Sequence, residues 1–558
     1  MYFSNPQNEN ISCKAFKLDI LSVCAAGCKV DYITDFFKNR QIPCAENGNL
    51  AICAQQDDSR SLTYIEESRS LSDEKYVLTT EFKDGRLYAH ITFGAERGLY
   101  YALCDLYRSI LDGEFRLGTV TEYPLFSVRG YIEGFYGTPW KQEQRLEMLE
   151  WLSAYRMNTY FYAPKDDPYH RERWSELYPS ESLAHLQCVV DKAKECHVDF
   201  WFCIAPGLDI CYSDEKQFAE LVAKCAQLYA IGVHRFGLLL DDIPQELHFD
   251  CDRALYGETV QAHISLVNRL FDALTNLGAG IQLTVCPMQY HGKGNEYYIS
   301  KLGQGIDGRI SMFWTGNNIC SQELTVPEAV RFADHTRHKP LYWDNYPVND
   351  AEMCHEMHLG WYTGREPELY RYAQGVIVNC MPYCLCNRIP LLTVADYLWN
   401  PVQYSEEQSW QYAMSQVVGE DAETFAFFAE HLTVSCLKSE VSPRMVDALS
   451  QFDTLRRTQG VKVATLHLET YLRSVQSCCD RLNFCKGDEL YIELAPWIEK
   501  FFVFKDILAQ CCAYLHSGDL TCKVTISEKL RQFMRLPEVM TDFAFQAAVE
   551  AILNIEVL

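Results

Sequence analysis

Between residues 127 and 379 the chain alternates short apolar runs with longer amphipathic stretches. The runs recur about every 30 to 45 residues and are rich in β-branched and aromatic side chains, which predicts buried strands. They are 127–134, 159–165, 198–207, 234–242, 281–287, 309–316, 339–345 and 375–379, and helix-like stretches such as 142–155 and 217–230 separate them. Eight buried strands with intervening helices predict a (β/α)8 barrel, the TIM-barrel fold. A doubly wound open sheet is the alternative, and the count of eight favours closure.

The region before the barrel has a different pattern. Residues 86–93 alternate apolar and polar positions, as a half-buried strand does, and after Gly94 apolar residues recur at helical spacing. The two apolar sets are Leu87, Ala89, Ile91 and Phe93, and then Leu99, Leu103, Leu106 and Ile110. Residues 1–124 therefore predict a small α/β domain, followed by the catalytic barrel at 125–400.

Strand signals stop after about Asn400. Trp497, Phe501, Phe504 and Leu508 mark one amphipathic helix in this part of the chain. We expect residues 401–558 to form a C-terminal helical bundle.

Length, composition and net charge limit the number of domains and the classes of partner that we expect. A chain of 558 residues is too long for one hydrophobic core, so we expect two to four domains. The 48% hydrophobic and 22% charged residues are typical of a globular protein. A formal net charge of −25 argues against nucleic acid or an anionic membrane as partner and favours neutral substrates.

The sequence also bears on compartment and cofactors. No apolar segment is long enough for a membrane span, and the N-terminus has no secretory pattern. The 25 cysteines are scattered and not spaced as a disulfide framework, so we expect a reduced, cytoplasmic protein, although a secreted chain without its signal would look the same. His355 and His358 miss the H-E-x-x-H spacing by one residue, and Cys380, Cys384 and Cys386 form no C-x-x-C pair. We therefore expect no metal and no other cofactor.

Polar side chains of catalytic types follow seven of the eight predicted strands. The C-terminal strand ends of a (β/α)8 barrel meet at one face, and that face carries the chemistry. The residues are Glu133, Gly134, Lys165, Asp166, Asp167, Asp241, Asp242, Tyr290, Thr315, Trp343, Asp344, Asn345 and Asn379. Each alone has a structural explanation, such as a helix cap for Asp241 or barrel core for Trp343. Because all of these would have to coincide at one face, we expect a functional site there.

Five segments resemble those of a known enzyme family. Residues 129–140 read RGYIEGFYGTPW and residues 162–171 read YAPKDDPYHR. Both resemble signatures of glycoside hydrolase family 84, the family of O-GlcNAcases and bacterial hyaluronidase-like β-N-acetylglucosaminidases. Asp-Asp-Ile at 241–243, WDNYPVND at 343–350 and GVIVN at 375–379 resemble the family's motifs at strands four, seven and eight. The resemblance covers the whole barrel, and the flanking regions follow the family's order.

The resemblance implies a substrate and a role for each residue. The substrate would be a terminal β-linked N-acetylglucosamine on a glycoprotein or glycan, removed with retention through an oxazoline. Asp241 would orient and polarise the 2-acetamido N–H, and Asp242 would be the general acid and then the general base. The sugar subsite would contain Gly134, Lys165, Tyr290, Thr315, Trp343, Asn345, Asp350 and Asn379, although Met288-Gln289 departs from the family's sequence. The sequence does not identify the natural aglycone. It also does not determine the oligomeric state, for which a homodimer is one possibility.

Two adjacent carboxylates suit this mechanism. A retaining glycosidase with an enzymic nucleophile needs carboxylates about 5 Å apart on opposite sides of the bond, which neighbours at one strand end do not readily provide. If the substrate's acetamide oxygen attacks instead, one aspartate stabilises the cyclising amide and the other protonates the leaving oxygen. Repulsion within the pair would keep one of them protonated near neutral pH.

Two other functions stay open at this point. A related enzyme would act on β-N-acetylgalactosaminides or within hyaluronan. A non-catalytic barrel would bind N-acetylglucosamine without cleaving it, and the adjacent aspartates together with Lys165 argue against that.

Overall fold

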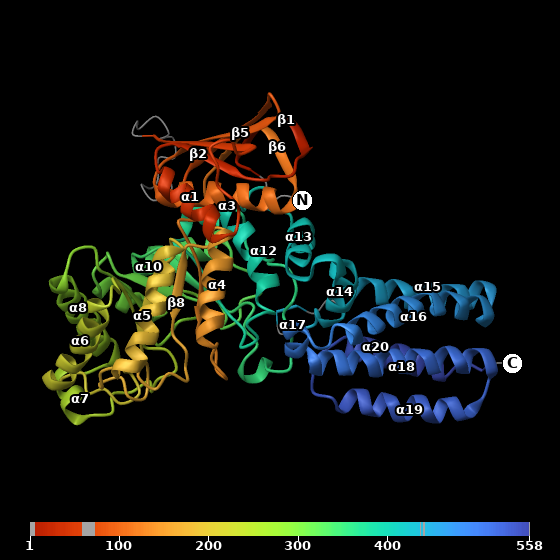
Figure 1. The fold of residues 1–558 in the computed structure, drawn as a ribbon. Helices are drawn as coiled ribbons and strands as arrows, with labels where there is room; N and C mark the ends of the chain where they lie inside the picture. Colours follow the sequence, from red (N-terminus) through yellow and green to blue (C-terminus); the bar gives the residue numbers. More distant parts are fainter. Residues whose placement is uncertain (1–5, 58–72, 436, 439–440, 557–558) are drawn as a thin grey trace.

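The protein consists of three regions that follow one another along the chain. The computed structural model describes residues 6–57, 73–435, 437–438 and 441–556. Figure 1 shows a sheet domain at the top, a barrel below it and an elongated set of helices that extends to one side. No helix among the described residues is long and apolar enough to cross a bilayer.

The first region is a six-stranded mixed sheet with helices packed on one face (Figure 1). In spatial order the strands are β1 (Asn8–Lys17), β6 (Glu114–Glu122), β4 (Tyr76–Lys83), β5 (Arg86–Phe93), β3 (Leu50–Gln56) and β2 (Val23–Gly27). The helices are α1 (Val30–Asn39) and α3 (Glu96–Asp112). The alternation predicted for β5 is present, since Leu87, Ala89 and Ile91 are buried against the helices.

Eight parallel strands form a closed barrel, so the sequence prediction is confirmed and the open sheet is excluded. The strands are β7 (Val128–Glu133), β8 (Thr159–Tyr162), β9 (Asp199–Ile204), β10 (Arg235–Leu239), β11 (Gln282–Cys286), β12 (Ser311–Trp314), β13 (Pro340–Asp344) and β14 (Gly375–Asn379). Strand β14 pairs with β7 and closes the ring. Helices cover the outer face of each strand, which explains why the strands are apolar on both sides.

The helices of the barrel wall fill the connections between strands. They are α4 (Gln142–Ala154), α5 (Ser180–Glu195), α6 (Glu215–Ala230), α7 (Asp250–Tyr256), α8 (Thr259–Leu277), α9 (Tyr297–Gly305), α10 (Val326–Thr336), α11 (Leu369–Tyr372) and α12 (Arg388–Trp399). A short 3-10 turn, η2 (Ala351–Met353), follows β13. The longest loops follow the strands' C-terminal ends, where a site has most room.

Aromatic side chains fill the barrel interior. Phe161 stacks on Trp201 with ring centres 4.8 Å apart, and Phe313 meets both Phe161 and Trp343 edge-on. This cluster is separate from the larger core between strands and helices. The barrel interior is therefore a packed core, and Trp343 lies in this core near the C-terminal ends of the strands.

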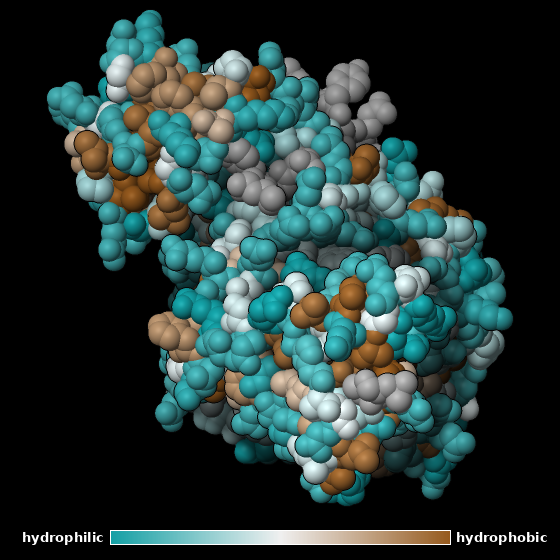
Figure 2. Space-filling model, turned by 90° about the vertical axis from the view of Figure 1, so that its right-hand side faces the viewer, coloured by the Kyte–Doolittle hydropathy of each residue, from teal (hydrophilic) through white to brown (hydrophobic). Residues whose placement is uncertain are grey.

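The third region is helical throughout its described residues, as predicted. Its elements are α13 (Glu406–Val418), η3 (Gly419–Asp421), α14 (Ala422–Ala429), η4 (Glu430–Leu432), α15 (Pro443–Gln459), α16 (Val461–Phe484), α17 (Glu489–Glu493), α18 (Ala495–Ser517), α19 (Leu520–Arg535) and α20 (Asp542–Leu553). The predicted stripe of Trp497, Phe501, Phe504 and Leu508 is the buried face of α18. Viewed toward the far end of these helices, the surface carries apolar residues scattered among hydrophilic ones (Figure 2).

The helical region also contacts the barrel loops. The Glu493 carboxylate accepts hydrogen bonds from the backbone N–H groups of Leu385 and Cys386, at 3.2 and 2.9 Å. The Trp497 indole N–H donates to the His355 carbonyl at 3.1 Å. The segments that follow β13 and β14 are thus supported from outside the barrel.

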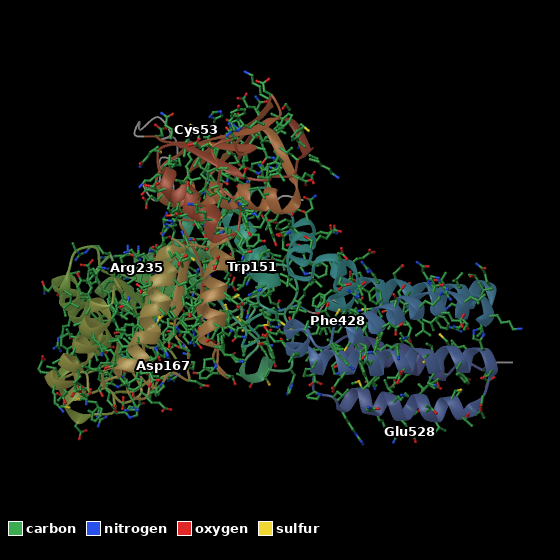
Figure 3. All side chains as sticks on the ribbon, in the orientation of Figure 1. Cys53, Trp151, Asp167, Arg235, Phe428 and Glu528 are labelled. Atoms are coloured by element: carbon green, nitrogen blue, oxygen red, sulfur yellow. The ribbon has the colours of Figure 1, made fainter. Side chains whose placement is uncertain are left out.

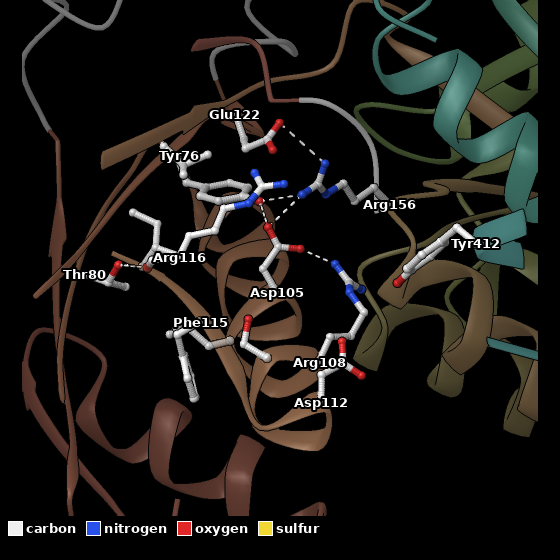
Figure 4. Close-up of a pocket in the computed structure, with 14 residues that line it drawn as sticks. Tyr76, Thr80, Asp105, Arg108, Asp112, Phe115, Arg116, Glu122, Arg156 and Tyr412 are labelled. Atoms are coloured by element: carbon white, nitrogen blue, oxygen red, sulfur yellow. Dashed lines mark hydrogen bonds and ion pairs between the residues drawn. The ribbon is translucent and has the colours of Figure 1, made fainter. Parts of the chain in front are cut away.

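Buried charged side chains connect the sheet domain to the barrel at the N-terminal ends of the barrel strands (Figure 4). Arg156, directly after α4, donates to the Asp105 carboxylate of α3 at 2.7 Å and lies 3.5 Å from Glu122 of β6. Asp105 also pairs with Arg108, and the Trp399 indole N–H donates to Glu122 at 2.8 Å. Burial raises the pKa of Glu122 to about 7, against the opposing effect of Arg156.

The two ends of the barrel point in opposite directions. Arg235, the first residue of β10, lies on the side of the sheet domain, and Asp167, which follows β8, lies at the far end (Figure 3). Arg235 forms an ion pair with Asp199, which also pairs with Arg97 of the sheet domain. The C-terminal strand ends are therefore turned away from that domain.

Candidate active site

One cavity of about 940 Å³ opens at the C-terminal ends of the barrel strands, within the size range of small-molecule sites. It contains all ten residues to which the family resemblance gives a catalytic or sugar-binding role: Gly134, Lys165, Asp241, Asp242, Tyr290, Thr315, Trp343, Asn345, Asp350 and Asn379. These residues come from seven of the eight strand ends and from the loop after β13. The fold thus brings together positions that are up to about 245 residues apart in the chain.

Asp241 is the buried member of the carboxylate pair. Its residue is 8% exposed, and the Lys165 ammonium donates to Oδ2 at 3.0 Å. Burial alone raises the pKa of the Asp241 carboxyl, but Lys165, together with a backbone hydrogen bond and Arg171, outweighs burial and holds that pKa below its usual value. Reciprocally, burial lowers and Asp241 raises the pKa of Lys165, with a net increase. The two groups are therefore a charged pair at neutral pH.

The other oxygen of Asp241, Oδ1, indicates where a ligand would bind. Oδ1 is buried and has no hydrogen-bond partner among the residues that the structure describes. A buried carboxylate oxygen without a donor is costly, and in native proteins it calls for an explanation such as a ligand. A ligand that places an N–H or O–H group in the cavity would satisfy it.

Asp242 is held by different partners. The Tyr136 hydroxyl donates to its Oδ2 at 2.9 Å, and the Tyr290 hydroxyl to its Oδ1 at 3.3 Å. Burial raises the pKa of both phenols, so they stay protonated as donors. Arg171 donates to the Tyr136 hydroxyl at 3.0 Å and to the Asp242 carbonyl at 3.3 Å, which fixes this arrangement.

The backbone explains how two neighbouring side chains reach one cavity. Successive residues of an extended strand point to opposite faces. Asp242 has a φ of 52°, in the left-handed region that aspartate tolerates better than most residues. This turn breaks the alternation directly after β10, and both carboxylates line the cavity.

The floor of the cavity is built around Asn345. Its Oδ1 accepts from the Trp343 indole N–H and from Asn379 Nδ2, both at 3.1 Å, and its Nδ2 donates to the Ile319 carbonyl at 2.8 Å. Asn379 Oδ1 is buried and, within the described chain, has no donor. The cavity therefore offers a second acceptor opposite the carboxylate pair.

Gly134 makes room for this floor. A Cβ at this position would lie 2.7 Å from Cζ2 of Trp343 and 3.1 Å from Oδ1 of Asn379. No side chain fits there without moving the Trp343 ring. Gly134 thus allows β7 to approach β13 and β14 closely at the site.

The remaining predicted residues shape the rim. The Asp350 Oδ2 accepts from the backbone N–H of Tyr136 at 2.7 Å, and burial raises the pKa of the Asp350 carboxyl. The Thr315 hydroxyl donates to the Asn318 carbonyl at 2.7 Å, and its N–H donates to the Tyr290 carbonyl at 2.9 Å. Thr315 therefore positions the loops that carry Tyr290 and Asn318.

Three polar residues at strand ends point elsewhere. Glu133 is fully buried against Arg145 and the Tyr160 hydroxyl. Asp167 accepts from the hydroxyls of Tyr162 and Tyr178, and Asp344 pairs with Arg365. These side chains hold the barrel wall and its loops, and the strand-end rule alone does not separate them from the cavity residues.

Sequence reasoning did not single out several residues of the cavity. Tyr136 lies within the GFYG segment at 134–137, which was a signal for it. The others are Cys286 at the end of β11, three residues of the 3-10 turn η2, and residues of irregular loops, which have no periodicity. The last two groups are Ala351, Glu352 and Met353, and then His291, Asn318, Ile319, Cys320, Gln322 and Val348. The cysteines weighed as metal ligands, Cys380, Cys384 and Cys386, lie buried in the barrel wall, and burial raises the pKa of each thiol.

Comparisons with known proteins identify the family to which the chain belongs. A family model described as beta-N-acetylglucosaminidase matches residues 129–430, more than half of the chain. Protein O-GlcNAcase of Rattus norvegicus and that of Mus musculus are each 33% identical over 276 residues, or 48% of this chain and 29% of theirs. The chain therefore corresponds to less than a third of the length of these relatives.

Solved structures extend the likeness. A mutant of Thermobaculum terrenum O-GlcNAc hydrolase is 31% identical with a TM-score of 0.74, covering 77% of this chain and 95% of that one. The structure named CpGH84B is 25% identical with a TM-score of 0.84 and covers 99% and 100%. CpGH84D, at 19% identity and a TM-score of 0.78, shares the fold. The chain belongs to the beta-N-acetylglucosaminidase family, glycoside hydrolase family 84.

Proposed function

We propose that this protein is a retaining exo-β-N-acetylglucosaminidase of the O-GlcNAcase type, which removes terminal β-linked N-acetylglucosamine. Family membership and the named relatives support the reaction class. The observation that carries the proposal is the unequal pair of carboxylates. Asp241 forms an ion pair with Lys165 through Oδ2, while its buried Oδ1 has no partner among the described residues. Asp242 instead accepts hydrogen bonds from two tyrosine hydroxyl groups.

Asp241 suits the acetamide of the substrate. An N–H group of the bound sugar would satisfy Oδ1, while Lys165 keeps the carboxylate ionised through Oδ2. A fixed negative charge beside the N–H increases the electron density of the amide oxygen as it attacks the anomeric carbon. The same charge then stabilises the oxazolinium that forms.

Asp242 suits proton transfer at the glycosidic oxygen. In the first step its carboxylic acid gives a proton to the departing oxygen as the C1–O bond breaks and the acetamide oxygen bonds to C1. In the second step its carboxylate removes a proton from water, which attacks C1 and opens the oxazoline. Two inversions at C1 give net retention. The expectation that repulsion from Asp241 keeps Asp242 protonated stays a prediction.

The opposite side of the cavity suits the sugar hydroxyls. Asn379 Oδ1 and the Asp350 carboxylate supply acceptors, and the Trp343 ring supplies an apolar surface for a pyranose. These groups would hold a terminal residue, which supports an exo-acting enzyme.

The proposal is tested with an aryl β-N-acetylglucosaminide. Proton NMR of the first-formed product should show the β-anomer, and an initial α-anomer would exclude the mechanism. Rates should fall steeply as the acetyl group is progressively fluorinated, because fluorine weakens the attacking oxygen. A flat response would mean that the amide does not take part.

Matched substrates resolve the specificity. An N-acetylgalactosaminide and a hyaluronan polymer, assayed beside the glucosaminide, distinguish the two related activities. Binding of N-acetylglucosamine without any turnover would assign the non-catalytic alternative.

The natural setting is also a proposal. A glycoprotein or glycan in the cytoplasm fits a chain in which none of the described cysteines is paired in a disulfide. Assembly as a homodimer stays a prediction, and so does independence from nucleic acid, membranes and cofactors.

A further inference from the structure

Two cysteines outside the cavity lie in contact. Cys211 follows β9 in the loop that leads to α6, and Cys251 is in the first turn of α7. Their sulfur atoms are 3.4 Å apart, although the residues are separated by 40 positions in the chain. Cys211 is buried and Cys251 is exposed. One thiol is therefore open to solvent, and the other lies directly behind it.

A third residue keeps the two segments in place. The Asp252 carboxylate accepts from the backbone N–H of Tyr212 at 2.9 Å and from that of Ser213 at 2.7 Å. These bonds tie α7 to the loop directly after each cysteine, so the two segments are held together independently of the sulfur contact. Asp252 is fully buried, which makes this connection rigid.

The hydrogen bonds of Asp252 favour a disulfide over a zinc site at this position. Cys211, Cys251 and Asp252 place three ligand-type atoms within 4.8 Å of one another. Structural zinc takes four ligands in tetrahedral geometry, usually from cysteine and histidine. Here the carboxylate already accepts two backbone hydrogen bonds, and the group has no histidine. Two thiols in contact need only an oxidant to become a disulfide.

The two thiols differ in reactivity. Hydrogen bonds from the Ser213 hydroxyl and the Cys211 thiol lower the pKa of Cys251, whereas burial raises the pKa of Cys211. The thiolate is the nucleophile in thiol oxidation, so Cys251 reacts first and Cys211 resolves the product.

We propose that Cys211 and Cys251 form a reversible dithiol–disulfide site that hydrogen peroxide oxidises. The Cys251 thiolate attacks one peroxide oxygen, the O–O bond breaks, and Cys251 becomes a sulfenic acid while hydroxide leaves. The Cys211 thiolate then attacks the Cys251 sulfur, the S–S bond forms and hydroxide is displaced. In sum two thiols and one peroxide give one disulfide and two waters.

Cys251 lies nine residues beyond Asp242 in the chain, in the first turn of the helix that follows the β10 loop. The disulfide would covalently attach this helix to the loop after β9. The prediction concerns sulfur chemistry, so its outcome does not depend on the glycosidase activity.

The test is a peptide map of the full chain after brief treatment with limiting peroxide, followed by alkylation of the remaining thiols. Trypsin cleavage after Arg235 and Arg253 isolates Cys251 in a peptide without another cysteine. We expect the main product to be this peptide joined to the one containing Cys211, with a loss of two hydrogen atoms and recovery on reduction. Fragmentation locates the bond at Cys211.

Variants provide matched controls. Cys251→Ser, at an exposed position, should abolish the cross-link, while serine at the exposed Cys188 or Cys354 should leave it unchanged. Cys211→Ser should leave Cys251 as a sulfenic acid that dimedone traps. Oxidation spread evenly over the exposed cysteines would overturn the proposal. So would one zinc ion per reduced chain that is lost in Cys251→Ser.

Discussion

Both ends of the barrel bury charged side chains, but they satisfy them in different ways. At the N-terminal ends of the strands, Arg156 lies between Asp105 and Glu122, and Arg129 pairs with Glu74, so opposite charges of two domains meet each other. At the C-terminal ends, Lys165 engages one oxygen of Asp241 and leaves the other toward a cavity. One end uses buried charge to join domains, and the other keeps it available for a ligand.

Strand β7 contributes to both ends. Arg129, near its start, donates through Nε to the Arg156 carbonyl at 2.9 Å, and Gly134, just past its end, admits the Trp343 ring. Substitutions at the two ends should therefore separate stability from catalysis. The predictions below test that separation.

The largest effect is expected at the carboxylates. Asp242→Ala should lower kcat/KM for an alkyl N-acetylglucosaminide by about 10²–10⁴, because a poor leaving group needs a proton. An aryl substrate with a good leaving group should lose far less in its first step. Asp241→Ala should slow both substrates by similar factors, on the order of a hundredfold or more, because charge develops on the acetamide whatever leaves.

Rates over a leaving-group series give one slope for each variant. Asp166→Ala is the matched control, since Asp166 is an exposed aspartate at the same face and does not line the cavity. A steeper slope for Asp241→Ala than for Asp242→Ala would reverse the two roles. Full activity in both variants would place the site elsewhere.

The next largest effect is expected at the junction between the sheet domain and the N-terminal ends of the strands. Arg156→Met should reduce the free energy of unfolding by about 3–5 kcal/mol, because it removes the ion-pair partner of buried Glu122 and leaves Asp105 with Arg108 alone. The kcat/KM of the folded protein should change little. Denaturant titrations measure the loss, and Arg457→Met, at an ion pair whose arginine is 70% exposed, should cost at most about 1 kcal/mol. Equal losses in both variants would contradict the assignment of Arg156.

Glu122 adds a pH dependence to the same junction. Its pKa is raised from an ordinary 4.5 to about 7, chiefly by burial, so the folded state favours the protonated acid. This contribution is complete below pH 4.5 and is lost as the pH rises through 7. The wild type should therefore lose up to about 3 kcal/mol that Glu122→Gln retains. Melting temperatures of both proteins at pH 5 and pH 8.5 measure this, and a constant difference between them would refute it.

The smallest effect is expected at Gly134. Gly134→Ala should lower kcat/KM by about 10–100-fold, because the added methyl group displaces Trp343 or Asn379 from its position in the cavity. Gly308→Ala is the control, since no atom of the described residues lies within 4 Å of a Cβ at that position. An unchanged kcat/KM in Gly134→Ala would mean that the floor adapts and that the close fit is not required.

The strand ends show how much of the candidate site the sequence predicts. The apolar runs correctly located eight strands, and the motifs within them named ten residues that line one cavity. The same rule also selected Glu133, Asp167 and Asp344, which bind other side chains of the barrel. It missed the loop residues after β12 and β13, because irregular segments have no period from which to infer their direction.

The sequence by itself determined the barrel, the face at which the candidate site lies and the presence of two neighbouring acids there. Strand period and burial are local properties that a chain carries in its residue pattern. Only the tertiary structure decided which oxygen of Asp241 is free, that Tyr136 and Tyr290 hold Asp242, and that Cys211 meets Cys251. These contacts depend on single backbone torsions, such as the left-handed φ of Asp242, and on packing between loops that are far apart in the chain.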